Sequence, residues 1–238
     1  MKKTILTIIF FIFLNPYAKA VNFEGPATQY SITMTYLEMC ELGSTDALCL
    51  NPVTIGSGES GLIDIANTAA GVAAASYGSL SNVKFGKSYS YMQVTMRRLI
   101  TIAGTVSDGT NTCRTDGDNS DISKNVPGKT TGDASTVTLY IGDTTAGNGD
   151  NVNSIDAGDG TGTAQAVGTI NDTDLFVQFR GPLVTPVTLK PGQIPTMTVA
   201  FGTSEALGYS GSNGGCAAAA GEQQGLYGSS PDVTITIK

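Results

Sequence analysis

A regular alternation of apolar and polar residues marks the middle of the chain. Between residues 86 and 106 the alternation has a period of two, which predicts a long β-strand with one side facing a core. The pair Arg97-Arg98 interrupts it before Leu99, as is typical of a β-bulge that redirects the chain. Such a basic pair either binds an anionic group or protects a solvated sheet edge from aggregation, and we expect the second.

Further short segments alternate in the same way between Gly- and Pro-containing turns. They are residues 30–36, 52–55, 62–65, 136–141, 174–180, 183–189, 196–201 and 233–237. We expect loops at 107–132, 142–168 and 204–230, and one or two turns of helix within 66–76. These elements predict an all-β fold, an antiparallel Greek-key β-sandwich with long acidic loops and at most one short helix.

The first twenty residues have the pattern of a signal peptide. Lys2-Lys3 precede the apolar run Ile5–Leu14, and Ala18-Lys19-Ala20 provides small residues at a cleavage site. No later stretch is apolar for long enough to form a membrane helix. We expect residues 1–20 to be removed and residues 21–238 to form a single exported domain without a transmembrane segment. Its destination is the periplasm, the cell surface or the medium.

Charge and composition exclude several classes of function. Once residues 1–20 are removed, the chain has 10 basic and 20 acidic residues, a formal charge of −10. Such a negative charge argues against nucleic acid as a partner. The chain contains no His, so Ser-His or Cys-His nucleophiles and histidine-based zinc sites are excluded. Few acidic residues lie on predicted strands, namely Glu38, Glu41 and Asp64, and no Trp is present to form a sugar platform. We therefore expect no enzymatic activity.

Four cysteines in an exported chain predict two disulfides. Cys40 and Cys49 would close a short loop, and Cys113 and Cys216 would join the middle of the chain to its last part. The sequence allows three pairings, and only the closeness of Cys40 to Cys49 favours this one. Neither a C-x-x-C spacing nor a histidine supports a metal site.

One acidic segment resembles the beginning of a calcium loop, with oxygen donors at Asp116, Asp118, Ser120 and Asp121. Asp121 occupies the position that needs Gly, and Pro127 the position that needs a bidentate Glu. We expect a solvated acidic turn here and no other cofactor, with calcium as the alternative.

The order of segments over residues 30–106 resembles that of exported bacterial β-sandwich proteins of uncharacterised function. The resemblance rests on Y-L-E-M-C at 36–40, L-I-D-I at 62–65, a small-residue stretch, and G-K-S-Y-S-Y-M-Q-V-T-M-R at 86–97. It implies an immunoglobulin- or prealbumin-like arrangement and carries no catalytic residues.

Two non-enzymatic functions remain. The first is a structural or adhesive surface protein, including a filament subunit, in which a terminal strand completes the open sheet of another copy or of a different surface protein. The residues expected at that contact are Tyr30, Ile32, Met34, Tyr36, Val233, Ile235 and Ile237. The alternative is a monomeric binding module whose acidic loops hold a glycan, a peptide or calcium. Terminal strands that close the protein's own sandwich would leave it monomeric.

Overall fold

The structure is a computed structural model. It describes residues 21–68, 77–119, 122, 125–141, 154–156, 174–193, 195–211, 216 and 225–238. The predicted signal peptide, most of the predicted helix at 66–76 and most of the 142–168 loop lie outside these ranges. Within them, no helix is long and apolar enough to cross a membrane.

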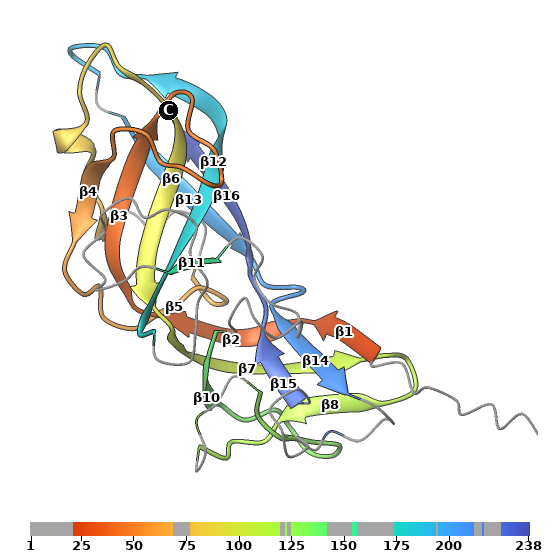
Figure 1. Ribbon diagram of the computed structural model, residues 1–238. Helices are drawn as coiled ribbons and strands as arrows, with labels where there is room; N and C mark the ends of the chain where they lie inside the picture. Colours follow the sequence, from red (N-terminus) through yellow and green to blue (C-terminus); the bar gives the residue numbers. More distant parts are fainter. Residues whose placement is uncertain are drawn as a thin grey trace, which may run out of the picture.

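The largest sheet has seven strands and forms the upper part of the molecule (Figure 1). The order is β13-β16-β12-β6-β3-β4, and β11 pairs with β12. The bounds are β3 Met34–Glu41, β4 Val53–Ser57, β6 Ser88–Arg97, β11 Ser154–Asp156, β12 Phe176–Thr188, β13 Met197–Gly202 and β16 Asp232–Ile237. All pairings are antiparallel except that of β12 with β16, which meet at Leu183 and Ile235.

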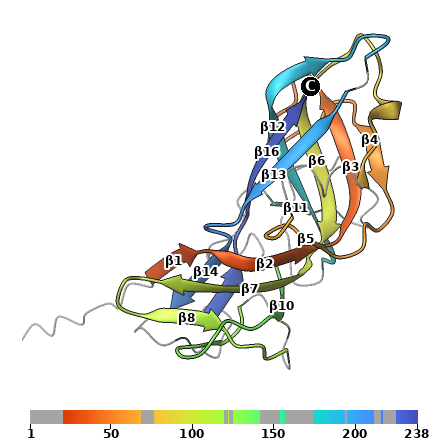
Figure 2. The same cartoon turned by 180° about the vertical axis from the view of Figure 1, so that it is seen from behind.

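Two smaller sheets form the lower part, where most strands run across those of the upper sheet (Figures 1 and 2). One has the order β5-β2-β7-β8-β9 with β10 on β7, and the other has the order β1-β14-β15. The bounds are β1 Val21–Gly25, β2 Ala27–Ile32, β5 Ile63–Asp64, β7 Leu99–Ser107, β8 Thr112–Thr115, β9 Gly128–Lys129, β10 Val137–Tyr140, β14 Leu207–Gly211 and β15 Gly225–Gly228.

Two nearly continuous strand pairs connect the upper and lower parts. β2 leads into β3 across Thr33, and β6 leads into β7 across Arg98. The two bends are neighbours, because the backbone N–H of Arg97 donates to the carbonyl of Thr33 at 2.9 Å. The interruption that Arg97-Arg98 predicts is therefore a change of sheet.

Each part has its own hydrophobic core. In the upper part, Leu37 and Met92 of β3 and β6 pack in one cluster with Val199 and Ile235 of β13 and β16, so these strand pairs face each other. In the lower part, buried residues of β2, β7 and β10 pack against those of β14 and β15. The all-β sandwich with several antiparallel sheets is thus confirmed.

Four details of the prediction are wrong. The single strand expected at 30–36 is divided at Thr33 between β2 and β3, which belong to different sheets. The expected loop at 107–132 contains β8 and β9, and that at 204–230 contains β14 and β15. The two strands expected at 174–180 and 183–189 form the single strand β12, whose register with β6 shifts between Pro182 and Val187. β9, β14 and β15 contain Gly, which weakens the alternation, and β8 has only four residues. A bulge resembles a turn in sequence, which explains the division of β12 into two strands.

Both predicted disulfides are present. Cys40–Cys49 has a Cα–Cα distance of 5.1 Å and Cys113–Cys216 one of 5.3 Å. Two disulfides indicate an oxidising environment, as in exported proteins.

Candidate functional site

An apolar cavity lies where the two cores meet. It has a volume of about 350 Å³, which is in the range of pockets that hold small molecules or a partner's side chains. Its walls come from β2, β3, β6, β12, β13 and β16. The lining residues are Tyr30, Ile32, Met34, Leu37, Ile65, Met92, Val94, Met96, Ile141, Phe179, Arg180, Gly181, Pro182, Val199, Phe201, Ser230, Pro231, Asp232, Val233 and Ile235.

Methionines give the cavity wall an adaptable surface. Met34, Met92 and Met96 line it, and Met34 pairs directly with Met96 across β3 and β6. Methionine is unbranched and polarizable, so such a wall can fit apolar groups of different shapes. Val94 and Phe179, which pair across β6 and β12, are only partly buried although they lie in the middle of the sheet. Their exposure indicates that the cavity is open to solvent.

Most of the residues predicted to make contact with a partner line this cavity. They are Tyr30, Ile32, Met34, Val233 and Ile235, whereas Tyr36 and Ile237 are not among the lining residues. All seven lie in strands that pair within the chain: β2 with β5 and β7, β3 with β4 and β6, and β16 with β12 and β13. The terminal strands therefore close the protein's own sheets.

One edge of the upper sheet borders the cavity. Among the described residues, β13 has a strand neighbour, β16, on one side only. Thr196 and Lys238 exchange both backbone hydrogen bonds, at 2.9 and 3.0 Å. Antiparallel pairs alternate between bonded and non-bonded positions, so Val199 and Phe201 direct their backbone N–H and C=O groups toward the other edge. The same two residues point their side chains into the cavity.

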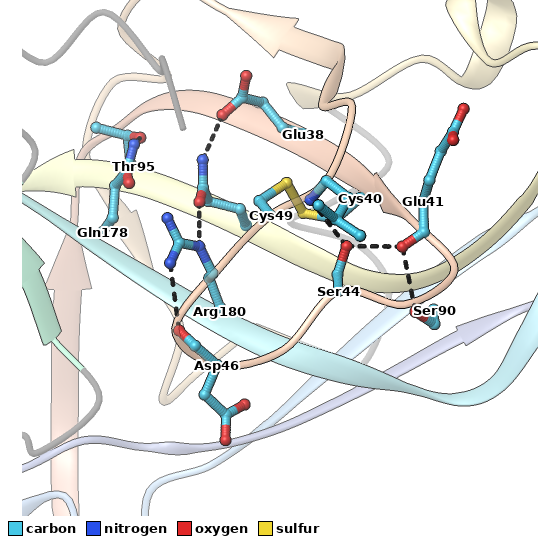
Figure 3. The surroundings of a disulfide bond; sticks show 12 residues. Glu38, Cys40, Glu41, Ser44, Asp46, Cys49, Ser90, Thr95, Gln178 and Arg180 are labelled. Atoms are coloured by element: carbon cyan, nitrogen blue, oxygen red, sulfur yellow. Dashed lines mark hydrogen bonds between the residues drawn. A yellow bond between two sulfur atoms is a disulfide. The ribbon is translucent and has the colours of Figure 1, made fainter. Parts of the chain in front are cut away.

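On the outer face of the upper sheet, opposite the cavity, a buried row of polar side chains crosses three strands (Figure 3). Glu38, Gln93 and Arg180 are direct neighbours on β3, β6 and β12, and each is no more than 5% exposed. The Gln93 amide donates to the Glu38 carboxylate at 2.7 Å, and its oxygen accepts from Arg180 Nε at 2.5 Å. Gln93 thus links two buried ions that would otherwise lose their hydration without compensation.

Burial dominates the ionisation of this row. Burial raises the pKa of Glu38, against the opposing effects of the Gln93 hydrogen bond and the Arg180 charge. Burial also lowers the pKa of Arg180, which the charge of Glu38 partly offsets. Both shifts have the same cause: desolvation disfavours the charged form of each group.

The loop closed by Cys40–Cys49 covers this polar row (Figure 3). Arg180 Nη1 donates to the carbonyl of Asp46 at 3.3 Å, and Ser44 Oγ donates to the carbonyl of Glu41 at 2.6 Å and accepts from the N–H of Leu50 at 2.9 Å. The disulfide and these bonds fix the loop against the outer face of the sheet.

The two adjacent arginines have different surroundings. Arg97 is partly exposed and pairs with Glu59. Arg98 is 1% exposed, donates from Nε to the carbonyl of Ile141 at 2.8 Å, and lies 5.5 Å from the centre of the Tyr140 ring. The expectation of a solvated basic pair is therefore wrong for Arg98, which satisfies backbone carbonyls at the bend between the sheets.

The calcium candidates are only partly described. Asp116 Oδ1 accepts from the backbone N–H of Asp118 at 2.9 Å, which is an ordinary Asx turn, and Ser120 and Asp121 lie outside the described residues. In the part of the chain that is described, no three His, Cys, Asp or Glu residues are grouped as metal ligands would be.

The other strand-face acids have structural partners. Glu41 forms an ion pair with Lys87 at 3.3 Å. Asp64 Oδ1 accepts from the backbone N–H groups of Tyr30 and Ala66, at 3.0 and 3.1 Å. Burial would raise the pKa of Asp64, but hydrogen bonds from Asn67 and these N–H groups lower it overall. Asp64 thus anchors the turn after β5.

Comparison with known proteins gives no family assignment. No family model, no curated protein and no solved structure matches the chain. The cavity and the adjoining edge of β13 are therefore the features that bear on function. The sequence indicated the apolar strand faces that form the cavity, but not that Val94, Phe179 and Phe201 would meet there, because this depends on how the sheets pack.

Proposed function

We propose that this is an exported, non-enzymatic structural or adhesive surface protein that binds an extended apolar segment of another protein by strand addition. The added strand would pair with the open edge of β13 and direct alternate side chains into the cavity. If the donor is another copy, the product is a filament. In strand addition, backbone hydrogen bonds supply affinity and pockets for alternate side chains supply specificity.

The observation that carries the proposal is that Val199 and Phe201 offer both backbone hydrogen-bonding groups and an apolar pocket to an added strand. Their backbone groups point toward the open edge, and their side chains line the cavity. A strand placed along this edge gains hydrogen bonds and apolar contacts together. Five of the seven residues that the sequence assigned to a contact line the cavity, where the chain acts as the acceptor of the added strand.

A pair of substitutions at Val199 tests the proposal. Val199→Pro removes an N–H that faces the open edge and none of the bonds to β16, which is the setting in which a strand tolerates proline. Val199→Ala truncates the same side chain and keeps the N–H. We expect both variants to fold, and Val199→Pro to weaken strand addition at least tenfold more than Val199→Ala, since it removes a backbone bond and blocks close approach of the strand.

Two measurements provide the readout. Light scattering and negative-stain microscopy of residues 21–238 report self-assembly, and fluorescence anisotropy reports binding of a labelled peptide with the sequence of residues 232–238. Assembly identifies a filament subunit, and peptide binding by a monomer identifies a binding module. Equal behaviour of the two variants, or no assembly and no peptide binding by the unsubstituted chain, would rule out strand addition at β13.

A further inference from the structure

Three connections meet at the end of the molecule farthest from β1, at the top of Figures 1 and 2. They join β3 to β4, η1 (Leu80–Asn82) to β6, and β12 to β13. The backbone N–H of Leu42 donates to the carbonyl of Ser88 at 2.8 Å, and that of Gly86 donates to the carbonyl of Leu189 at 2.9 Å. These bonds hold the three connections together as one surface, which we call the tip.

Large apolar side chains at the tip face solvent. Phe85 is 56% exposed and Leu42 is 59% exposed. Phe85 stands in the sequence K-F-G-K, between Lys84 and Lys87. Neither apolar residue belongs to a core cluster. An exposed aromatic residue flanked by lysines has the composition of segments that bind at the interface of a lipid bilayer.

The charge of the tip is opposite to that of the whole chain. Lys84, Lys87 and Lys190 are three of the 10 basic residues of a chain that carries 20 acidic residues after residue 20. In the three connections, residues 41–52, 83–87 and 189–196, the acidic residues are Glu41 and Asp46. A hydrogen bond from Asn51, together with Lys87 and Lys84, lowers the pKa of Glu41 and keeps it ionised, and its ion pair with Lys87 at 3.3 Å offsets its charge. The lysines are therefore concentrated where apolar side chains are exposed.

We infer that the tip docks on an anionic lipid bilayer, with Phe85 and Leu42 in the interface and Lys84 and Lys190 against the lipid phosphates. Each lysine near an anionic surface contributes a several-fold gain in binding, and the exposed side chains add apolar burial. Because the rest of the chain carries a net negative charge, an anionic bilayer favours the orientation with the tip toward the membrane. Docking leaves β1, β14 and β15 pointing away from the membrane.

Vesicle binding by residues 21–238 tests this inference. We expect binding to vesicles of phosphatidylcholine with one third phosphatidylglycerol, weakening as salt rises, and no binding to pure phosphatidylcholine. Lys84→Gln with Lys190→Gln should lower the partition coefficient roughly 20-fold. Phe85→Ser should lower it about tenfold. Lys129→Gln in β9 and Leu62→Ser, at a residue that is 63% exposed, are the matched controls away from the tip.

A tryptophan probe tests which surface docks. The chain contains no Trp, so Phe85→Trp creates a single reporter. Its emission should shift to shorter wavelength with anionic vesicles and be quenched by brominated lipids, whereas Leu62→Trp should show neither effect. Absence of binding to anionic vesicles, equal losses in the control variants, or equal shifts for both probes would each overturn the inference. Thermal unfolding of every variant separates lost binding from lost folding.

Discussion

Gln93 is the residue on which the buried polar row depends. Its amide group donates to a carboxylate and accepts from a guanidinium, so one neutral side chain satisfies two ions. Gln178, equally buried on the next strand, instead donates to the neutral hydroxyl of Thr95 at 3.0 Å. The sheet therefore has a charged and an uncharged buried contact side by side, and only the charged one links stability to pH.

The burial of Glu38 predicts in which direction the free energy of unfolding changes with pH. Burial raises its folded-state pKa above the ordinary value of 4.5. Its contribution to stability is therefore complete below pH 4.5 and is lost as the pH rises through the folded-state pKa. Glu38→Gln removes this titration, so the free energy of unfolding of the unsubstituted protein, minus that of the variant, should decrease from pH 4 to pH 8.

Urea denaturation at several pH values measures this difference. Glu205→Gln, at an exposed glutamate, controls for the loss of one carboxylate. A difference between the unsubstituted protein and Glu38→Gln that stays constant with pH would contradict a raised pKa of Glu38 in the folded state.

At the scale of elements, glycines in β14 and β15 make room for tyrosine rings. Gly208 pairs with Tyr227 across these strands, and a Cβ at Gly208 would collide with the Tyr227 ring. A Cβ at Gly228 would lie 2.8 Å from Ile100 Cδ1. These strands therefore depend on glycines that stand three residues apart in each strand, and this spacing breaks the alternation that identifies a strand in a sequence.

Gly208→Ala should lower the free energy of unfolding by about 2 kcal/mol, because the added methyl group overpacks the tyrosine. The matched control is Gly181→Ala in β12, where the new Cβ would lie 3.8 Å from Ile235 Cδ1, an ordinary contact. That change should be neutral or stabilise by up to about 0.5 kcal/mol, since alanine reduces the entropy of the unfolded chain. Equal destabilisation of both variants in urea denaturation would contradict this account of β14 and β15.

The strands that could be predicted are those in which apolar and polar residues alternate in the sequence, even where both faces of the strand are buried, as in β6. Alternation correctly placed β6, β7, β10, β13 and β16, whereas the segment 30–36 combined the end of β2 with the start of β3. It did not reveal β14 or β15, where Gly and Ser interrupt the apolar positions, nor the short strand β8, nor the burial of Arg98. The cavity could not be predicted at all, because it is formed by side chains from six strands whose relative position depends on the fold.

For the whole molecule, the two disulfides differ in the length of chain that they close. Cys113–Cys216 spans 103 residues and Cys40–Cys49 spans 9. In the chain-entropy model, replacing both cysteines of the long loop by Ser should lower the free energy of unfolding by about 4.7 kcal/mol, and replacing those of the short loop by about 2.6 kcal/mol. Urea denaturation of the two double variants checks this order, and a larger loss for the Cys40–Cys49 variant would contradict it.

The bent strand pairs β2–β3 and β6–β7 have a mechanical consequence. The same two stretches of backbone run from the lower sheets into the upper one, and they are bonded to each other on both sides of the bend. A pull between the tip and the opposite end is carried along these strands, so their cross-strand bonds are loaded together in shear rather than opened one after another. This arrangement resists a force applied between the two ends of the molecule, because the force is shared by two hydrogen-bonded strand pairs and does not act on a single linker.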